Sequence, residues 1–293
     1  MKYAFVDEHR ASYPVGRLCR ALEVTASGYY AWRRRPPSQR ALANQALLVD
    51  IRASHARSRR TYGSPRVHAD LVAQGQRCSR HRVARLMRQD RLQARPRRRF
   101  RPKTTQVDPR LPVAPNRLQR PFQASAPNQT WLSDITYVAT AEGWLYLAVV
   151  LDLHSRRVVG WAMARHLETP LVLSALQLAL GRRQPPAALL HHSDRGSQYA
   201  SRDYQAALAS YQVQPSMSRA GNCYDNAPME SFFATLKVER VYCRRYQTRD
   251  EARQDLVAYI EGFYNPTRRH SALGYRSPME FEQATSVAKL PVH

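Results

Sequence analysis

The sequence predicts an α/β core with a mixed sheet flanked by helices, preceded by an all-helical region. Three observations support this fold class. Apolar residues recur at helical spacing over residues 1–93, and a segment rich in proline and arginine follows at 94–127. After residue 128, short β-branched and aromatic runs alternate with helical patterns, as in layered α/β folds.

The first segment, residues 1–40, has a pattern typical of a small helix-turn-helix. Apolar side chains between Val15 and Leu22 follow helical spacing, and Thr25 or Ser27 is a suitable cap for a second short helix. We therefore expect two or more short helices here.

Residues 41–93 predict a clearer three-helix unit of the helix-turn-helix type. Ser64 and Pro65 are expected to open the second helix, and Gly75 to close it. Ser79 then caps a third helix with a strongly basic face, and such a helix can reach phosphates and base edges in a major groove. The alternative is an ordinary solvated helix face. The basic residues on this face are Arg80, Arg82, Arg85 and Arg88.

Residues 94–127 predict an extended basic linker. The segment has seven prolines and no glycine, and it contains the run Arg97, Arg98, Arg99. Such a composition does not bury a core, so we expect the linker to lie along a DNA backbone. The alternative is a disordered tether without a binding role.

The core is expected to span 128–285, including its C-terminal helices, with a short tail at 286–293. Three sequential strands separated by tight polar turns predict an antiparallel meander. The expected strands are 129–140, 144–152, 156–164, 187–192 and 213–217, and the expected helices are 169–180, 204–210, 228–242 and 249–264.

The charge of the chain indicates a polyanionic partner. Lys and Arg number 46 against 22 Asp and Glu, a formal net charge of +24. An anionic membrane is the weaker candidate, because no apolar run approaches the roughly 18 residues of a membrane span. Nucleic acid is therefore the expected partner.

Targeting and cysteine usage indicate a cytoplasmic, nucleoid-associated protein. The start of the chain has no secretory pattern, since Met1 leads into a charged stretch rather than an apolar segment. The four cysteines are far apart and form no C-x-x-C pair, which argues against a zinc knuckle or a disulfide framework.

Three acidic residues, Asp134, Asp194 and Glu230, form the candidate catalytic set. Asp134 lies within a core-forming strand, and Asp194 follows an apolar strand at the edge where α/β proteins usually place their sites. Glu230 is expected in the first turn of a helix, where the helix dipole favours its ionised form. An isolated acid in such a position is more often a helix cap or a salt-bridge partner than a catalytic residue. The prediction therefore depends on the presence of all three acids together.

Carboxylates that converge on one point repel one another unless a divalent cation neutralises them. Mg²⁺ suits such a site because it prefers oxygen ligands and keeps positions for water and phosphate. We expect two ions about 3.5–4 Å apart, with Mn²⁺ as an alternative, bound by all three acids. Lys237, seven residues after Glu230, is predicted to reach DNA beside the metals.

Two histidines next to Asp194 are weaker candidates for metal ligands. His191 and His192 are adjacent on a strand, so their side chains are expected to point to opposite faces of the sheet. The two histidines are therefore not expected to bind the same metal ion. Core packing or orientation of Asp194 is the favoured interpretation. Cys223 and Tyr224 are expected to shape the loop before the third acid rather than to react.

The motifs around these acids resemble those of bacterial insertion-sequence transposases of the OrfB type, in the retroviral-integrase superfamily with its DDE core. Four strings carry the resemblance, together with the 35 residues between Asp194 and Glu230 and the basic Lys237. The strings are WLSDIT at 131–136, HSDRGSQY at 192–199, GNCYDNAPMES at 221–231 and YNPTRRHSALGYRSP at 264–278.

The resemblance spans nearly the whole chain and implies an RNase H-like core. It also implies an enzyme that nicks element ends and joins the freed 3′-hydroxyls to another phosphodiester. Arg268 and Arg269 in the last string are expected to contact DNA. A homo-oligomer is expected in the synaptic complex, and many relatives act with, or fused to, the product of an upstream reading frame.

Two other functions compete with transposition. A metal-dependent nuclease of the same fold would cut without strand transfer, and the DNA-binding parts on both sides of the core argue against it. A non-catalytic DNA-binding regulator has no need to hold three carboxylates together.

Overall fold

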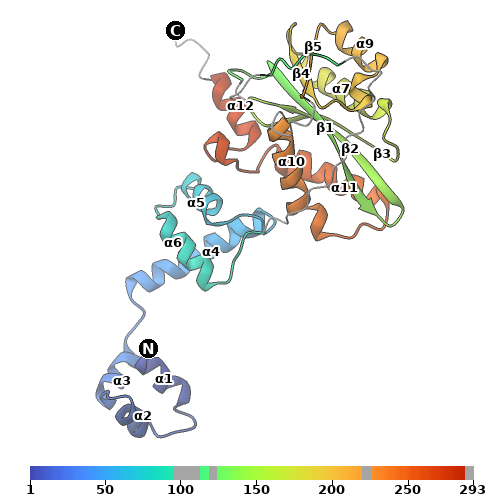
Figure 1. Cartoon of the computed structure of the whole chain (residues 1–293). Helices are drawn as coiled ribbons and strands as arrows, with labels where there is room; N and C mark the ends of the chain where they lie inside the picture. The colour runs from blue at the N-terminus through green and yellow to red at the C-terminus, as the bar shows by residue number, and fades with distance from the viewer. Residues whose placement is uncertain (96–112, 119–123, 220–225, 288–293) are drawn as a thin grey trace, which may run out of the picture.

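The computed structural model describes residues 1–95, 113–118, 124–219 and 226–287. Two helical units precede a sheet covered by helices on both faces (Figure 1). None of the helices in these ranges has both the length and the apolar character needed to cross a membrane.

The N-terminal unit consists of α1 (Lys2–His9), α2 (Val15–Ala21) and α3 (Ala26–Arg34), around a small core that includes Val6 and Tyr29. The hydroxyl of Thr25 accepts a hydrogen bond from the Gly28 amide, which confirms one of the two predicted caps. Helix α1 was not predicted, since its sequence has no amphipathic pattern.

The second unit has the three predicted helices, α4 (Gln39–Arg57), α5 (Ser64–Ala73) and α6 (Arg80–Gln89). Ser79 caps α6 as expected, through a 3.3 Å bond from the Arg82 amide to its Oγ. Gly75, just past the end of α5, has a φ of +85°, a conformation that glycine adopts at little cost. Gly63, rather than Ser64, occupies the N-cap of α5.

The core is a five-stranded sheet in the order β3-β2-β1-β4-β5. The meander of β1 (Thr130–Thr140), β2 (Gly143–Asp152) and β3 (Val158–Ala164) is antiparallel, as predicted. Strands β4 (Leu190–Ser193) and β5 (Gln214–Met217) run parallel to β1. This mixed topology confirms the predicted RNase H-like fold.

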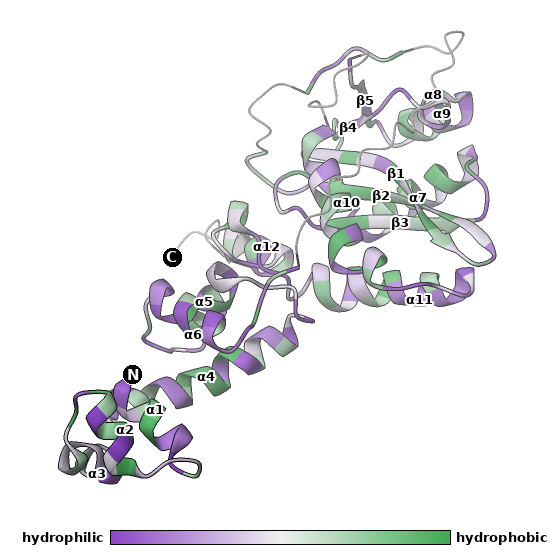
Figure 2. Cartoon of the chain, turned by 60° about the horizontal axis from the view of Figure 1, so that its bottom comes forward, coloured by the Kyte–Doolittle hydropathy of each residue, from purple (hydrophilic) through white to green (hydrophobic). Residues whose placement is uncertain are grey.

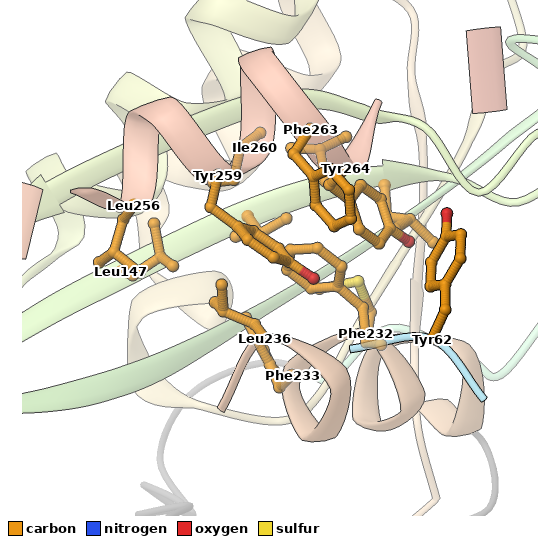
Figure 3. Packing of buried hydrophobic residues seen from close by; sticks show 14 of the residues in the cluster. Tyr62, Leu147, Phe232, Phe233, Leu236, Leu256, Tyr259, Ile260, Phe263 and Tyr264 are labelled. Atoms are coloured by element: carbon orange, nitrogen blue, oxygen red, sulfur yellow. The ribbon is translucent and has the colours of Figure 1, made fainter. Parts of the chain in front are cut away.

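Helices cover both faces of the sheet. One face packs against α7 (Thr169–Arg183), α8 (Ser197–Ala200) and α9 (Arg202–Ser210). The other packs against α10 (Ala227–Glu239), α11 (Arg249–Tyr259) and the following π-helical turn η3 (Ile260–Tyr264) (Figure 3). The remaining elements are the 3-10 turns η2 (Val241–Cys243) and η4 (Ser271–Leu273), and α12 (Pro278–Val287).

The hydropathy of the ribbon matches this layering, because apolar residues follow the strands and α7, whereas α1–α6 mix polar and apolar residues (Figure 2). Gly160 on β3 permits the close approach of α7. A Cβ at this position would lie 2.2 Å from the carbonyl oxygen of Ala175. The close packing of α7 on β3 therefore requires glycine at position 160.

Several predicted bounds were wrong for local reasons. The strands expected from 156 and 187 begin at Val158 and Leu190, because Arg156 and Ala188 have φ values of 61° and 68° that interrupt extended backbone. The helix expected over 249–264 is α-helical only to Tyr259, and the helix expected over 228–242 ends at Glu239.

The helical unit α4–α6 docks on the C-terminal end of the core. Tyr62 packs in the same cluster as Phe263 and accepts a 2.7 Å hydrogen bond from the amide of Arg269 (Figure 3). Arg66 donates to the carbonyl of Arg269 at 2.9 Å. The C-terminal string of the sequence therefore joins the two parts of the molecule.

Candidate active site

Asp134 lies on β1, and Asp194 directly follows the neighbouring parallel strand β4. The β1–β4 ladder pairs Leu132 with His192. Each aspartate follows its member of this pair by two residues, so both side chains belong to the same face of the sheet. This face also carries α10 and its acid.

Asp134 is half-buried, and its Oδ1 accepts a hydrogen bond from the Ile135 amide at 2.7 Å. Burial raises the pKa of Asp134 well above its usual value, and the negative charges of Asp194 and Glu230 raise it further. Lys237 opposes the rise. Ionising Asp134 is thus unfavourable until a cation reaches the site.

Asp194 is held by the turn that follows it. Its Oδ1 accepts a 2.9 Å hydrogen bond from the Gly196 amide. The side chain of Arg195 turns away and donates to the carbonyl of Ser218 at 2.7 Å. The predicted loop after β4 therefore fixes the carboxylate at the strand's end.

Glu230 lies in the first turn of α10, as predicted, and is exposed. The N-cap residue, Asn226, makes no side-chain capping bond, and the preceding residues Cys223, Tyr224 and Asp225 lie outside the described residues. Glu230 is close enough to Asp134 to raise its pKa. Within the described ranges, however, no three acidic, histidine or cysteine side chains gather tightly enough to hold a metal ion.

The donor set nevertheless fits a hard divalent cation. Two carboxylates share one level of the sheet, a third lies within electrostatic reach, and the buried member resists ionisation. Oxygen ligands of this kind suit Mg²⁺. Asp134, Asp194 and Glu230 are the residues that would hold it.

Lys237 projects toward the same region from α10. Its Nζ lies 4.8 Å from the centroid of the Tyr137 ring, a cation-π distance. Burial lowers the pKa of Lys237, and Asp134 partly offsets the decrease. The predicted position of Lys237 beside the acids agrees with these contacts.

The two histidines serve the core. His191 lies with its Nε2 2.8 Å from Ser133 Oγ and 3.1 Å from the Tyr204 hydroxyl, on the face opposite the aspartates. Burial lowers the pKa of His191 to about 3. His192 is bracketed by Ser216 at 2.9 Å and Ser218 at 3.0 Å. Both arrangements agree with the favoured packing interpretation.

A cavity of about 320 Å³ opens beside the aspartates and was not predicted from the sequence. Four of its eleven lining residues are aromatic. The alternating pattern of β1 and β2 did not reveal this feature, because Tyr and Trp are also common in cores. The signal available was position: two of the aromatic residues follow Asp134 and Asp194 by three and five residues. The aromatic lining residues are Tyr137, Trp144, Tyr146 and Tyr199.

Three of the four predicted DNA-binding arginines on α6 are exposed, namely Arg80, Arg85 and Arg88. Arg82 is half-buried, and its Nε donates to Asn44 at 2.8 Å. The linker arginines at 97–99 lie outside the described residues. A later part of the linker, 113–118, contacts the core instead of extending away, since the Arg117 amide donates to Ser216 at 2.9 Å.

Arg268 and Arg269, which were predicted to contact DNA, are largely covered by other residues. Arg268 is 3% exposed and donates two hydrogen bonds to Glu239, at 2.7 and 2.9 Å. Arg269 donates to Asp70 of α5 and to the carbonyl of Tyr275. The sequence does not show whether an acidic residue neutralises a basic one in the fold. Because Glu239 and Asp70 neutralise these two arginines, we no longer expect them to contact DNA.

Comparisons with known proteins agree with this architecture. Two family models, each described as an integrase core domain, match residues 124–223 and 211–278, and a model described as an HTH-like domain matches 42–100. The chain is 44% identical to "Transposase InsF for insertion sequence IS3A" of Escherichia coli, over 96% of this chain and 98% of that protein. It is 46% identical to an "Insertion element IS600 uncharacterized 31 kDa protein" of Shigella sonnei, over 91% and 97%.

Among solved structures, a simian T-cell lymphotropic virus intasome aligns with a TM-score of 0.49 at 15% identity, over 77% of this chain and 73% of that chain. The HTLV-2 integrase catalytic core domain in complex with magnesium aligns with a TM-score of 0.43 at 17% identity, over 54% and 99%.

Integrase cores generally act with a divalent metal ion. The extent and identity of the match to IS3 transposases, together with the integrase core models, leave one conclusion about the family. The chain belongs to the insertion-sequence transposases with a DDE integrase core, which move DNA by strand cleavage and strand transfer.

Proposed function

We propose that Asp134, Asp194 and Glu230 are the catalytic acids of this transposase and together hold two Mg²⁺ ions, with Mn²⁺ as an alternative. The observation that carries the proposal is the β1–β4 register: Leu132 pairs with His192, and Asp134 and Asp194 each follow two residues after this pair. When bound, such ions activate the attacking oxygen and stabilise the leaving oxygen of a phosphodiester. Glu230 would close the set from α10 once DNA and metal are present.

The protein's own residues position the reacting strands. Asp194 is fixed by its bond from the Gly196 amide, so one metal ligand is oriented before DNA arrives. Lys237 lies near Asp134 and supplies a positive charge for the phosphate backbone. Cleavage frees a 3′-hydroxyl, and the same carboxylates then serve its attack on the second phosphodiester.

The helical unit α4–α6 is proposed to bind the element's ends. Arg80, Arg85 and Arg88 present exposed cations on α6, and Arg97, Arg98 and Arg99 extend the basic stretch along the sequence. We propose that these roles belong to separate segments of the chain, with the boundaries 1–40, 41–93, 94–127, 128–285 and 286–293. We further propose a homo-oligomer that holds two ends together, a partner from an upstream reading frame, and association with the nucleoid in the cytoplasm.

The test is a cleavage and joining assay on a labelled duplex that carries the terminal repeat of the element. Wild-type protein with Mg²⁺ is expected to give a nicked strand and joined products. Asp194→Asn keeps the shape of the side chain but loses its charge, and both products should fall at least a hundredfold, on the order expected for loss of a metal ligand. Asp203→Asn changes an exposed acid on α9 and serves as the matched control.

The proposal fails if Asp194→Asn cleaves and joins as wild type does. Cleavage without joined products in wild type would favour a nuclease. Binding without cleavage, with the upstream product supplied, would favour a regulator.

A further inference from the structure

Asp134 and Asp194 line a cavity whose aromatic side chains have no role in the metal chemistry described above. It is about 320 Å³ in volume, near the lower limit of about 300 Å³ for small-molecule sites. A cavity of this size fits one planar ring system rather than a duplex. Its lining residues are Asp134, Ile135, Thr136, Tyr137, Trp144, Tyr146, Leu167, Asp194, Gly196, Gln198 and Tyr199.

Two rings at the β1–β2 hairpin form an exposed aromatic wall. Tyr137 and Trp144 meet edge to face, with ring centroids 4.8 Å apart and an interplanar angle of 82°. Trp144 is 49% exposed, although a tryptophan of this size is usually well covered. The cation of Lys237 lies against Tyr137, so a positive charge adjoins the wall.

Tyr199, another residue of the cavity lining, has an unsatisfied polar group. Tyr199 is 2% exposed, and its hydroxyl has no hydrogen-bond partner among the described residues. A buried hydroxyl without a partner costs free energy. A ligand with a hydrogen-bonding edge would satisfy it.

We propose that the cavity binds one unstacked nucleobase from the DNA strand that is cut or joined at the adjacent carboxylates. A base has a flat face for Trp144 and a polar edge for the Tyr199 hydroxyl. Asp134 and Asp194 themselves line the cavity, so a nucleotide next to the reacting phosphodiester is the group that reaches it. The inference rests on the proposed function, because it requires that Asp134 and Asp194 engage the phosphodiester.

The base would leave the helix when the enzyme binds, which frees the reacting phosphodiester from the constraint of a stacked duplex. Enzymes that extrude a base meet a lower cost where the base is mismatched. A mismatch beside the cleaved position is therefore expected to strengthen binding by this transposase.

The experiment compares two duplexes that carry the terminal repeat, using the full chain without divalent metal so that no cutting occurs. One has a mismatched base at a nucleotide that flanks the cleaved phosphodiester, and the other is abasic there; both flanking nucleotides are tested. Wild type should bind the mismatched duplex at least about fivefold more tightly at one of the two positions, the lower bound for one base stacked on an aromatic ring.

Trp144→Ala should reduce this ratio to less than twofold while binding the abasic duplex as wild type does. Tyr199→Phe removes only the hydroxyl, and it should lower the ratio by about two- to tenfold, the range for one hydrogen bond. Tyr211→Ala is the matched control, because Tyr211 is also exposed but lies outside the cavity lining. It should leave the ratio unchanged.

A wild-type ratio of one at both positions, or a ratio that Trp144→Ala leaves intact, overturns the proposal. The same duplexes with Mg²⁺ separate this failure from failure of the catalytic assignment. If wild type cuts, Asp194→Asn does not, and the ratio is one, the base site alone is wrong. If Asp194→Asn cuts normally, the catalytic assignment is wrong whatever the ratio.

Discussion

At the scale of single residues, the main feature is a carboxylate that the fold keeps from ionising easily. Asp134 lies on a central strand, where burial and two nearby acids raise its pKa. Among the described residues, its hydrogen bond comes from the neighbouring Ile135 amide, and the positive charge of Lys237 offsets the rise in pKa only in part. The metal-free site is therefore electrostatically frustrated.

This frustration predicts how stability varies with pH. The folded protein binds the Asp134 proton more tightly than the unfolded chain does, so the stabilisation is fully present below the unfolded value near 3.8 and is lost as pH rises through the raised folded value. Without metal, the melting temperature of wild type should fall with rising pH more steeply than that of Asp134→Asn. Thermal unfolding across a pH series measures the difference.

Added Mg²⁺ should raise the melting temperature of wild type most at the alkaline end of the series, where the carboxylate is free to bind. Asp203→Asn, an exposed acid, should follow wild type throughout. Parallel curves for Asp134→Asn and wild type would show that Asp134 is not the group responsible.

Some residue assignments followed from the sequence and others did not. Asp134 and Asp194 were predictable as candidates. A carboxylate within a core strand is costly unless it has a partner, and the C-terminal edge of a strand is where α/β proteins usually place their sites. The partner of Arg268 was not, since Glu239 lies on α10 and only the tertiary fold brings the two together. The lack of a hydrogen-bond partner for the Tyr199 hydroxyl among the described residues was not predictable from the sequence, because it depends on which residues surround the ring.

At the scale of elements, contact between β3 and α7 depends on one missing side chain. A Cβ on Gly160 would lie 2.2 Å from Ala175 O and 2.7 Å from the Cβ of Ala179. Backbone atoms cannot move aside as a flexible side chain does, so α7 would have to shift away from the sheet.

Gly160→Ala should therefore lower the free energy of unfolding by about 1–3 kcal/mol, the usual cost of overpacking. Gly181→Ala is the matched control. Gly181 lies within α7 with open space around it, so the same substitution should stabilise the protein by about 0.5–1 kcal/mol through helix propensity. Denaturant titrations of both variants give the sign. Equal effects at the two glycines would contradict the proposed close packing.

The basic face of α6 gives a second prediction for an element. Arg85→Ala should weaken binding to duplexes of any sequence and reduce the dependence of log affinity on log salt by about 0.9, if the side chain neutralises one phosphate. Binding to terminal-repeat and unrelated duplexes, measured over a range of salt concentrations, tests both effects.

The control removes the same charge from the same helical unit. Arg52 on α4 donates hydrogen bonds to both carboxylate oxygens of Asp90, so its charge is already compensated. Arg52→Ala should change the salt dependence much less than Arg85→Ala does. An equal change would show that α6 has no particular contact with DNA.

The order and type of the core elements were predictable, because β-branched runs and helical spacing alternate clearly after residue 128. The bounds were less so. Arg156 and Ala188 adopt left-handed backbone conformations that neither residue type normally prefers, and tertiary packing imposes them. The change to a π-helical turn at Ile260 also has no local sequence signal.

At the scale of the whole molecule, the segment after η3 contacts the helical unit α4–α6. The segment after η3 carries Arg269 to Asp70 on α5, and Arg59 of the helical unit lies 5.1 Å from the centroid of the Phe263 ring. Asp70 also accepts hydrogen bonds from Ser54 and Arg57. Residues almost 200 positions apart thus join the helical unit to the catalytic core.

Arg269→Ala should loosen this junction. The side chain is 13% exposed, and its loss leaves Asp70 partly buried with fewer donors, at a cost of about 1–3 kcal/mol. Limited proteolysis between α6 and β1 should become faster than in wild type. The rate at which the core nicks a short duplex should change by a smaller factor than the proteolysis rate. Arg57→Ala removes a 53% exposed partner of the same Asp70 and should cost less than about 1 kcal/mol. Equal proteolysis rates in the two variants would argue against a junction at Arg269.

This junction was not predicted from the sequence. The string at 264–278 suggested a second DNA contact, because its basic residues are adjacent in the chain and no acid lies beside them. Their acids come from α5 and α10, and only long-range packing reveals these partners.

The parallel pairing of β1 with β4 also bears on the order in which the newly made chain gains its abilities. Helical units depend on local contacts and form quickly, whereas parallel strands joined by a long crossover form slowly. On the ribosome, α1–α6 emerge first, and Asp134 and Asp194 meet only after α7 and β4 have left the exit tunnel. Glu230 follows later still. If α4–α6 bind DNA as proposed, a chain still being synthesised would bind DNA near its own gene well before it can cut. That order would favour action on the copy of the element that encodes it.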